Sequence, residues 1–296
     1  MVKKTYCGYI AVIGRPNVGK STLINCLVGQ KISITARKPQ TTRHRILGIK
    51  TVDNNQAIYV DTPGLHKTAT RALNQYMNVA AISAINDVDL ILFVIDSLHF
   101  KEEDEWVLSK LEYCNCPIIL VINKVDRLED KLELLPSIEK LNQNKKFIDI
   151  FPISAKKNQN VDALEKRIFE LLPESPHYFD ANDVTDRSLR FMAAELIREK
   201  LIRNLGQEVP HALTVQIDQF KDNKKLITLS ATILVERQGQ KAIVVGKDGQ
   251  QLKIIGTDAR IEMEKLFDKK VFLRLWVKVK SGWSNDAKAL KSLGYD

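Results

Sequence analysis

The eight residues GRPNVGKS (14–21) constrain the fold more than any other stretch of the chain. They follow the apolar run YIAVIG (9–14) and precede KSTLINCLV (20–28), whose apolar residues recur at helical spacing. A Gly-x4-Gly-Lys-Ser loop between a strand and a helix turns backbone N–H groups inward at the helix N-terminus, where they can hold an anion. The pattern therefore predicts a phosphate-binding loop in an α/β fold.

Further apolar runs alternate with helical patterns as far as residue 172. The strand candidates are RILGIKTV (45–52), AIYVDT (57–62), DLILFVID (89–96), PIILVIN (117–123) and FIDIFPIS (147–154). Several are apolar throughout, as expected of strands that are buried on both faces. We expect a mostly parallel sheet with helices on both faces, and such sheets bind ligands at the carboxyl ends of their strands.

Residues suited to phosphate and Mg²⁺ lie at two of these strand ends. Lys20 in the loop would reach the β- and γ-phosphates, and the Ser21 hydroxyl would ligate Mg²⁺. In DTPGL (61–65), Asp61 can hold Mg²⁺ through water, and the Gly64 N–H can contact a γ-phosphate. The two motifs together predict a nucleoside triphosphate site.

Two later motifs predict that the base is guanine. In NKVD (123–126), the Asp126 carboxylate can accept both N–H groups of guanine's N1 and N2 edge, while the stem of Lys124 packs over the base. Adenine lacks that donor pair, and an unpaired buried carboxylate costs on the order of 1–3 kcal/mol, so the site should reject ATP. In SAK (154–156), the Ala155 N–H can face guanine O6. The candidate nucleotide contacts are Gly14, Asn17, Val18, Gly19, Lys20, Ser21, Thr22, Asp61, Gly64, Asn123, Lys124, Asp126, Ser154, Ala155 and Lys156.

The basic stretch KISITARKPQTTRHR (31–45) offers hydroxyls at Thr35, Thr41 and Thr42. A threonine that ligates Mg²⁺ only when a γ-phosphate is present makes an order–disorder switch. A solvated charged loop explains the same composition equally well.

Charge and composition favour a cytoplasmic protein with a polyanionic partner. The net charge is +9, and residues 1–50 hold ten Lys or Arg and no Asp or Glu, although solubility alone can also explain a basic chain. The N-terminus lacks a cleavable export signal, and no apolar run approaches the roughly 18–20 residues of a membrane helix. Cys7, Cys26, Cys114 and Cys116 are expected to be reduced structural thiols.

The alternation breaks at PESPHYFDANDVTDRS (173–188), so we expect domains at 1–172 and 189–296 joined by this linker. The second domain reads in the order α-β-β-α-α-β. Its clearest elements are the helix SLRFMAAELIREKLIRNLG (188–206), the strands ALTVQIDQF (212–220) and LITLSATILVE (226–236), the helix DARIEMEKLF (258–267) and the strand KVFLRLWVKV (270–279), in which Trp276 is expected in the core.

A second glycine loop, GKDG (246–249), lies between two apolar segments of this domain. With the element order, it resembles the KH domain in its second topological form, whose Gly-x-x-Gly loop clamps about four single-stranded nucleotides. Gly246 and Gly249 would allow close approach of a sugar–phosphate chain. Lys247 and Lys253 would add charge, and Asp248 departs from a wholly basic clamp. Residues 241–296 carry twelve Lys or Arg against seven Asp or Glu, which agrees with RNA binding.

Motifs over nearly the whole chain resemble those of the Era family of bacterial GTPases. They are GRPNVGKSTLIN, RKPQTTRHRI, DTPGLH, NKVD, SAK and TDRSLRFMAAELIREKL. The resemblance implies that Thr42 ligates Mg²⁺ with Ser21 and Asp61, and that Lys20, Asn17, Thr42 and Gly64 serve catalysis. It also implies a monomer that binds the 3′ end of small-subunit ribosomal RNA in 30S subunit assembly, with a possible peripheral membrane association.

Leu65 bears on the mechanism, since Ras-like proteins carry at this position a Gln that orients the attacking water. Leucine cannot hydrogen-bond water, so intrinsic hydrolysis should be slow. Related GTPases use K⁺ held partly by the phosphate-loop Asn, here Asn17, which we adopt as a hypothesis. Two other classes stay open: a GTPase that modifies RNA, and a switch that acts mainly through protein or membrane partners in cell-cycle control.

Overall fold

The computed structural model describes residues 4–294 except residues 37, 39, 66–71, 98–99, 143–145, 207–208 and 210–212. Within the described residues, no helix is long and apolar enough to cross a bilayer. The chain divides into two compact units. The first comprises Met1–Ser33, Thr42–Ala69 and Met77–Asp186, and the second comprises Ile34–Thr41, Thr70–Tyr76 and Arg187–Asp296.

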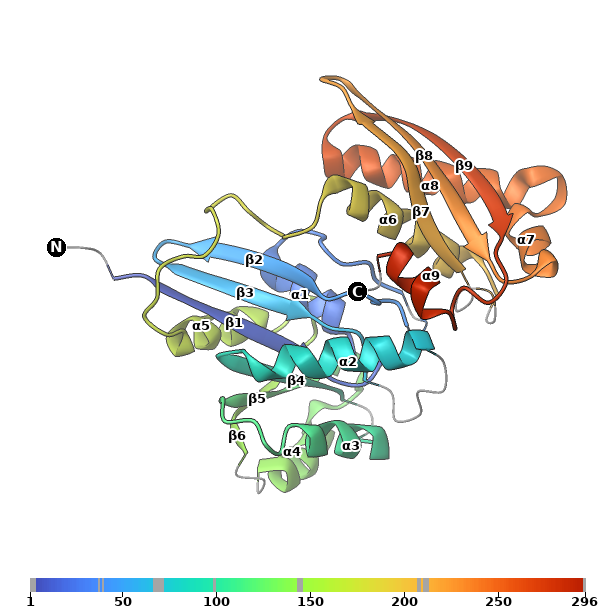
Figure 1. The fold of residues 1–296 in the computed structure, drawn as a ribbon. Helices are drawn as coiled ribbons and strands as arrows, with labels where there is room; N and C mark the ends of the chain where they lie inside the picture. Colours follow the sequence, from blue (N-terminus) through green and yellow to red (C-terminus); the bar gives the residue numbers. More distant parts are fainter. Residues whose placement is uncertain are drawn as a thin grey trace. The chain divides into compact units, whose positions relative to one another are not determined.

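The first unit is built on a six-stranded sheet, shown in Figure 1, with the strand order β2-β3-β1-β4-β5-β6. All neighbouring strands are parallel except β2, which is antiparallel to β3. The strands are β1 (Tyr6–Ile13), β2 (Ile46–Val52), β3 (Asn55–Asp61), β4 (Leu90–Asp96), β5 (Ile118–Asn123) and β6 (Phe147–Pro152). The mostly parallel sheet that the apolar runs predict is confirmed.

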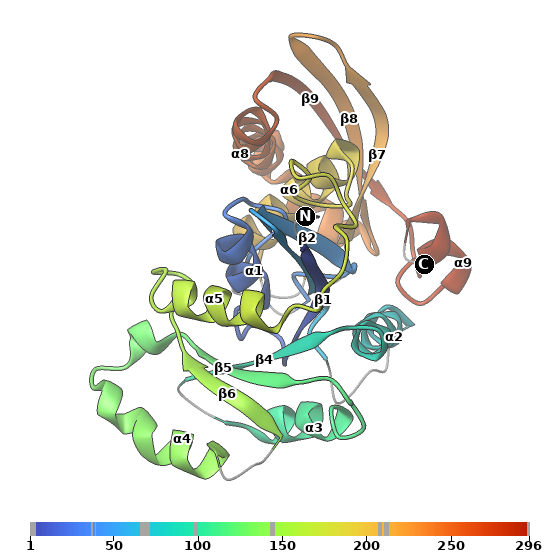
Figure 2. The same ribbon diagram turned by 90° about the vertical axis from the view of Figure 1, so that its left-hand side faces the viewer.

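Helices cover both faces of this sheet (Figure 2). The helices are α1 (Lys20–Val28), α2 (Ala72–Asn86), α3 (Glu102–Lys110), α4 (Leu135–Asn142) and α5 (Val161–Leu171), with short 3₁₀ turns at Val125–Arg127 and Lys131–Leu134. Alternate strand residues such as Ile13, Phe93 and Leu120 form a core with α2, α3 and α4. Helices α1 and α5 lie together on the other face. Burial on both faces explains why β4 is apolar at almost every position.

Residues 173–186, within the predicted linker, pack against the first unit along β1, β2 and the loop to β3. The Val184 carbonyl accepts a hydrogen bond from Ile49 N at 2.9 Å, and the Asp186 carboxylate accepts one from Leu47 N at 3.0 Å. The Tyr178 ring stacks on Tyr9 with 5.7 Å between centroids. These contacts hold the segment to the first unit as far as Asp186.

The second unit has a three-stranded sheet, β7-β8-β9, in which β7 and β8 are antiparallel and β8 and β9 are parallel. Its elements are α6 (Leu189–Asn204), β7 (Leu213–Asp222), β8 (Leu226–Val235), α7 (Gln238–Val245), α8 (Gln250–Phe267) and β9 (Lys270–Val279), followed by α9 (Ala287–Ser292). The predicted order α-β-β-α-α-β is confirmed, and α9 is an addition that the sequence analysis did not anticipate.

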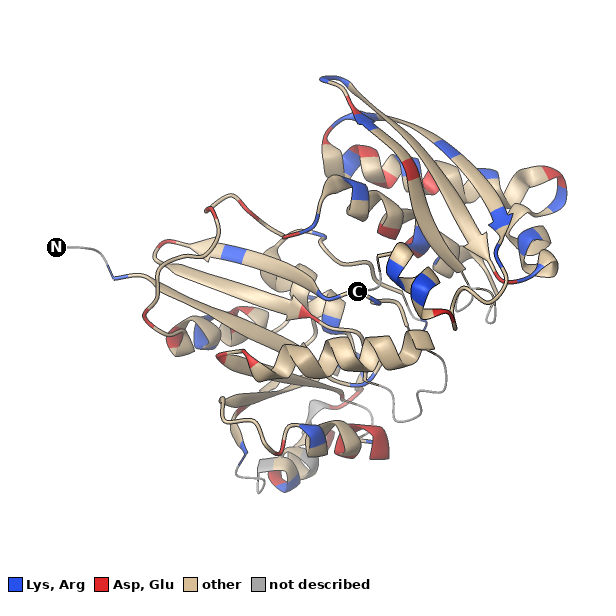
Figure 3. Ribbon diagram, in the orientation of Figure 1, with Lys and Arg blue, Asp and Glu red and all other residues tan. Residues whose placement is uncertain are grey.

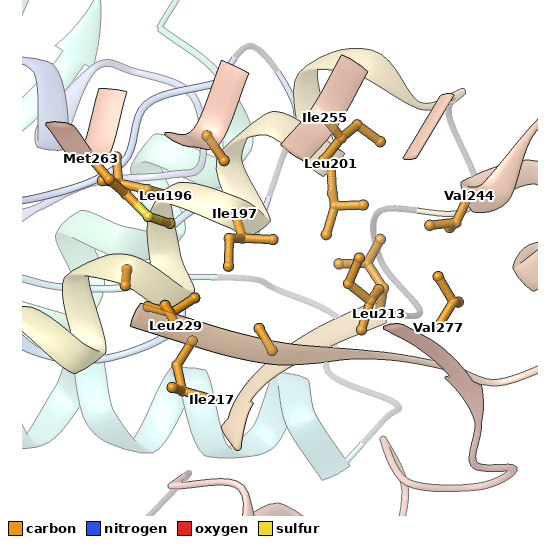
Figure 4. Close-up of a cluster of buried hydrophobic side chains, with 14 of the residues drawn as sticks. Leu196, Ile197, Leu201, Leu213, Ile217, Leu229, Val244, Ile255, Met263 and Val277 are labelled. Atoms are coloured by element: carbon orange, nitrogen blue, oxygen red, sulfur yellow. The ribbon is translucent and has the colours of Figure 1, made fainter. Parts of the chain in front are cut away.

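The core of this unit lies between the sheet and its helices. Figure 4 shows Leu196 and Ile197 of α6 and Met263 of α8 directed toward sheet residues such as Leu229. The expectation that Trp276 belongs to this core is wrong, because its side chain is 46% exposed. Side chains alternate between the two faces of a strand, and Val277 occupies the inward position beside it.

Candidate functional site

The phosphate loop joins β1 to α1, and its glycines are required by close backbone approaches. Gly14 and Gly19 have φ values of 156° and 102°. A Cβ at Gly14 would lie 2.3 Å from the Val94 carbonyl oxygen, and one at Gly19 would lie 2.3 Å from Nδ2 of Asn123. No side chain fits at either position, so the loop can fold against β4 and β5 only with glycine there.

Lys20 is buried at the start of α1. Its ammonium donates hydrogen bonds to the carbonyls of Gly14 and Arg15, each at 3.0 Å, which holds it across the loop. Burial lowers the pKa of Lys20 to about 8, an effect partly offset by the nearby Asp61 carboxylate. An anionic ligand in the loop would restore the charged form, because an opposite charge within a few ångströms raises a lysine pKa.

The residues predicted to ligate Mg²⁺ meet at the ends of β3 and α1. The hydroxyls of Ser21 and Thr42 lie 2.7 Å apart. Asp61 is fully buried, and neither of its carboxylate oxygens has a hydrogen-bond partner among the described residues. Burial raises the pKa of Asp61, although the nearby hydroxyls of Ser33, Ser21 and Thr42 and the charge of the Lys20 ammonium offset part of the rise. A buried carboxylate without a partner is costly unless a cation compensates it, so this donor set fits a magnesium ion.

Asn123 at the end of β5 connects three of the four motifs. Its amide nitrogen donates to the Val18 carbonyl in the phosphate loop at 2.9 Å. Its amide oxygen accepts from Lys124 N at 2.8 Å and from Ala155 N at 3.0 Å. The Ala155 N–H that we expected to face guanine O6 therefore donates to Asn123 in this structure, and its contact with the base stays a prediction that requires a shared hydrogen bond.

Asp126 and Lys124 are held by further partners. The Ser154 hydroxyl donates to Oδ1 of Asp126 at 2.6 Å and lowers the pKa of that carboxyl, which keeps it ionised. Lys124 adopts the left-handed conformation, with φ 68°. Its ammonium pairs with Asp96 at 2.7 Å and donates to the Asn17 carbonyl at 2.5 Å. The Lys124 stem thus connects this motif to the phosphate loop.

The turn after β3 is pressed against the phosphate loop. A Cβ added at Gly64 would lie 2.8 Å from Cα of Pro16, so residue 64 can approach the loop only as glycine. Leu65 is buried in the core with α2, α3 and α4. The remaining predicted contacts are Thr22 in the first turn of α1 and Lys156, which is exposed in the turn after Ser154.

Residues 34–41 belong to the second unit, where described residues of the segment contact α6. The buried Glu199 carboxylate accepts a hydrogen bond from Thr35 N at 2.9 Å. Arg203 donates to the Thr35 carbonyl at 2.9 Å, and Arg198 donates to the Thr41 carbonyl while paired with Glu195. Of the three candidate threonines, Thr42 alone lies beside Ser21, while Thr35 and Thr41 contact α6.

The second glycine loop opens onto a groove between α8 and β9. Gly246 and Gly249 have φ values of 73° and 75°, and Asp248 adopts φ 51°. A Cβ at Gly249 would meet no atom within 4 Å, so the backbone there is accessible to a ligand. Lys247, Asp248 and Lys253 are exposed. The groove has a volume of about 380 Å³ and is lined by Gly249, Leu252, Lys253, Gly256, Thr257, Arg260, Leu273 and Leu275.

Several residues of these sites were missed by sequence reasoning. Ser33 lies buried beside Asp61, and Asp96 pairs with Lys124. Asp96 ends a predicted strand at the binding edge of the sheet, so its position was a usable signal, whereas Ser33 carried none. All four cysteines are free in the structure, and burial raises the pKa of all four thiols.

Comparison with known proteins agrees with this geometry. Two family models match, described as "50S ribosome-binding GTPase" over residues 9–124 and "KH domain" over residues 208–284. The chain is 55% identical over 289 residues to GTPase Era of Pseudomonas aeruginosa strain PAO1, covering 98% of this chain and 95% of the relative. It is also 55% identical over 295 residues to GTPase Era of Yersinia pestis strain Pestoides F, covering 99% and 97%.

Two crystal structures match over almost the full length, each with a TM-score of 0.95 and 38% identity, covering 98% of this chain and 99% of the other. One is Era in complex with MgGDPNP and nucleotides 1506–1542 of 16S ribosomal RNA. The other is a variant of Aquifex aeolicus Era bound to GDP and AlF4⁻.

Fold and motifs together define a phosphate-loop GTPase domain followed by a C-terminal KH domain. Within that class, the sequence identity to the Era relatives and the share of each chain that is covered decide the family. The chain belongs to the Era family of GTPases.

Proposed function

We propose that this chain is a GTP-hydrolysing switch that binds single-stranded RNA, namely the 3′ end of small-subunit ribosomal RNA during 30S subunit assembly. The observation that carries the GTPase part is the buried Asp61 carboxylate, which has no hydrogen-bond partner in the described part of the chain and lies next to the Ser21 and Thr42 hydroxyls. The RNA part is supported by the open groove at Gly249 and by the matching Era structure, which contains nucleotides 1506–1542 of 16S ribosomal RNA.

In this mechanism, the residues of the first unit bind and orient GTP. Lys20 would pair with the β- and γ-phosphates, and the Gly64 N–H would contact the γ-phosphate. Ser21, Thr42 and Asp61 would hold Mg²⁺, which neutralises charge on the phosphates during transfer. Asp126 would read the guanine edge, with Asn123 and Ser154 holding its surroundings in place.

Water orientation is the step for which this site lacks a side chain at the usual position. Leu65 is buried and apolar, so it cannot hold the attacking water. We propose that K⁺ bound partly by Asn17 supplies the missing charge near the phosphates. Hydrolysis should then be several-fold faster in K⁺ than in Na⁺ buffer. An Asn17→Ala variant should lose the difference, and equal wild-type rates in both salts would remove potassium from the mechanism.

In the second unit, Gly246 and Gly249 would admit the sugar–phosphate chain while Lys247 and Lys253 attract it. The exposed Asp248 opposes that attraction, so the glycine backbone rather than net loop charge should carry the contact.

We take the domains as 1–172 and 189–296, with 173–188 between them. We further propose a cytoplasmic monomer, for which any association with the inner face of the membrane is peripheral.

The test is recovery of RNA from a lysate with the protein held in a non-hydrolysable GTP analogue or in GDP, followed by crosslinking and sequencing. We expect enrichment of one short single-stranded site at the 3′ end of the small-subunit RNA. Gly249→Asp should abolish the enrichment and leave RNA-free GTP hydrolysis unchanged. Diffuse recovery that is indifferent to Gly249→Asp would instead favour a switch acting on protein or membrane partners.

A further inference from the structure

The sheet of the C-terminal unit has an open face, opposite to α6 and α8, with a regular chemical pattern. Side chains of β9 alternate between the two faces. Those that pack with the helices are Val271, Leu273, Leu275 and Val277. Those on the open face are Lys270, Phe272, Arg274, Trp276 and Lys278, and all five are exposed. This outward row, which we term the β9 outer row, places two aromatic rings between three cations.

The two rings of the β9 outer row are available to a ligand. Phe272 and Trp276 are each 46% exposed, so they contribute little to the core. The Arg274 guanidinium lies 5.0 Å from the Phe272 ring centroid, within cation–π range. Four residues of strand separate the rings by about 13 Å, because a strand rises about 3.3 Å per residue.

The side chains that lie beside these rings on the neighbouring strand are short, so the rings project from the sheet. By strand register, Thr228, Ser230 and Thr232 of β8 lie beside Phe272, Arg274 and Trp276, and their short side chains are partly or fully buried between the strands. Lys221 of β7 lies beside Thr228 and adds a further cation.

One acidic side chain on this face is Asp218, whose carboxylate accepts a hydrogen bond from the Thr232 hydroxyl at 2.7 Å. Figure 3 shows basic residues at the start, middle and end of β9. The face is therefore aromatic and positively charged.

We propose that the β9 outer row is a second RNA contact, on which unpaired bases stack against Phe272 and Trp276 while Arg274 and Lys278 meet phosphates. This inference rests on the RNA-binding function proposed above and extends it to a surface outside the glycine-loop groove. That groove uses Leu273 and Leu275, which lie on the other side of the same strand. Since β9 is an edge strand, an RNA chain can pass around it from one face to the other.

The chemistry of the β9 outer row favours RNA over a protein partner. The cores of protein interfaces are depleted of lysine, whereas here cations and aromatic rings alternate along one strand. Base stacking on exposed aromatic side chains of a sheet is a recurrent mode of single-stranded RNA recognition. An RNA strand satisfies both groups at once, because its bases stack and its phosphates pair with the cations.

The experiment measures binding of two RNAs from the 3′ end of small-subunit ribosomal RNA to the full chain by fluorescence anisotropy. One has about four nucleotides, enough for the groove alone, and the other about twelve. Trp276→Ala should raise the Kd for the longer RNA by about 5- to 150-fold, since stacking contributes about 1–3 kcal/mol per base. The Kd for the shorter RNA should stay unchanged. Trp276→Phe keeps a ring and should restore most of the affinity.

Matched variants separate this inference from the proposed function. Tyr113→Ala, which removes an exposed ring of the first unit, should leave the Kd for both RNAs unchanged. Failure of the wild type to bind either RNA, or indifference to Gly249→Asp, would overturn the proposed function. Wild-type binding that is lost in Gly249→Asp but unchanged in Trp276→Ala would overturn only this inference.

A second readout follows Trp276 itself. The longer RNA should quench tryptophan fluorescence in the wild type, and the quenching should be lost in Trp276→Phe. The other two tryptophans are Trp283, which is fully buried, and Trp106, which lies in α3 of the first unit. Equal quenching in both proteins would contradict stacking at this position.

Discussion

Asn123 should stabilise the first unit before any nucleotide binds. Asn123→Ala removes one hydrogen bond donated to the Val18 carbonyl and two accepted from the N–H groups of Lys124 and Ala155. Val18 and Ala155 are buried, so two polar groups lose a partner that water cannot replace. At about 1–3 kcal/mol for each unsatisfied group, the free energy of unfolding should fall by about 2–6 kcal/mol. That loss is large against a typical domain stability of about 5–15 kcal/mol.

The assay is urea unfolding of the nucleotide-free protein, followed by far-ultraviolet circular dichroism. Asn86→Ala, at an exposed position in α2, is the matched control and should change the free energy of unfolding by less than about 0.5 kcal/mol. Asn123→Asp keeps both accepted hydrogen bonds but sets an oxygen against the Val18 carbonyl, so it should also destabilise. A stability loss under about 1 kcal/mol in Asn123→Ala, with GTP affinity abolished, would show that Asn123 serves the ligand and not the assembly of the motifs.

Three further outcomes are expected of the nucleotide site. Asp126→Asn should weaken GTP binding by about 10- to 150-fold, since charged hydrogen bonds contribute about 1.5–3 kcal/mol. The variant should favour xanthosine triphosphate, whose base presents an acceptor there, and an unchanged preference for GTP in a competition assay would contradict the assignment. Burial lowers the pKa of Lys20 to about 8, and a bound phosphate favours the protonated form. GTP affinity measured by calorimetry should therefore fall as pH rises through 8. Lys20→Ala should bind GTP weakly, and its affinity should depend less on pH. Leu65→Gln buries an amide at a core position, so it should lower the free energy of unfolding by about 1–3 kcal/mol, and a stable variant with Ras-like hydrolysis would refute the argument from burial.

The geometry of the candidate nucleotide site was predictable because each of its motifs is local. A loop such as GRPNVGKS needs glycine where the backbone approaches β4 and β5, and that requirement is visible in the residues themselves. The strand ends then bring Asp61, Asn123 and Ser154 to one edge of the sheet, as the expected topology requires. The Ser21, Thr42 and Asp61 cluster followed from the motifs together with the family resemblance.

The features that escaped prediction depend on contacts between segments distant in sequence. Glu199 looks like one more charge on an amphipathic helix, yet it is buried because Thr35 contacts it. The alternation of side chains around Trp276 was recognised, but Trp276 was assigned to the wrong face of the strand. A period of two does not show which of the two sets of alternate residues faces the helices. The sequence around Asp186 carries no signal that this is the last residue held to the first unit.

The contact of Thr41 with Arg198 has a mechanical consequence. The carbonyl of Thr41 is bound to α6, and the next residue, Thr42, contacts Ser21 in the first unit. A trans peptide fixes their Cα atoms about 3.8 Å apart, so Thr42 has almost no slack. Displacing Thr42 on nucleotide exchange would either carry the adjoining segment and α6 along or release its hydrogen bonds to α6. Linkage is reciprocal: if release changes RNA affinity by some factor, RNA must change nucleotide affinity by that same factor.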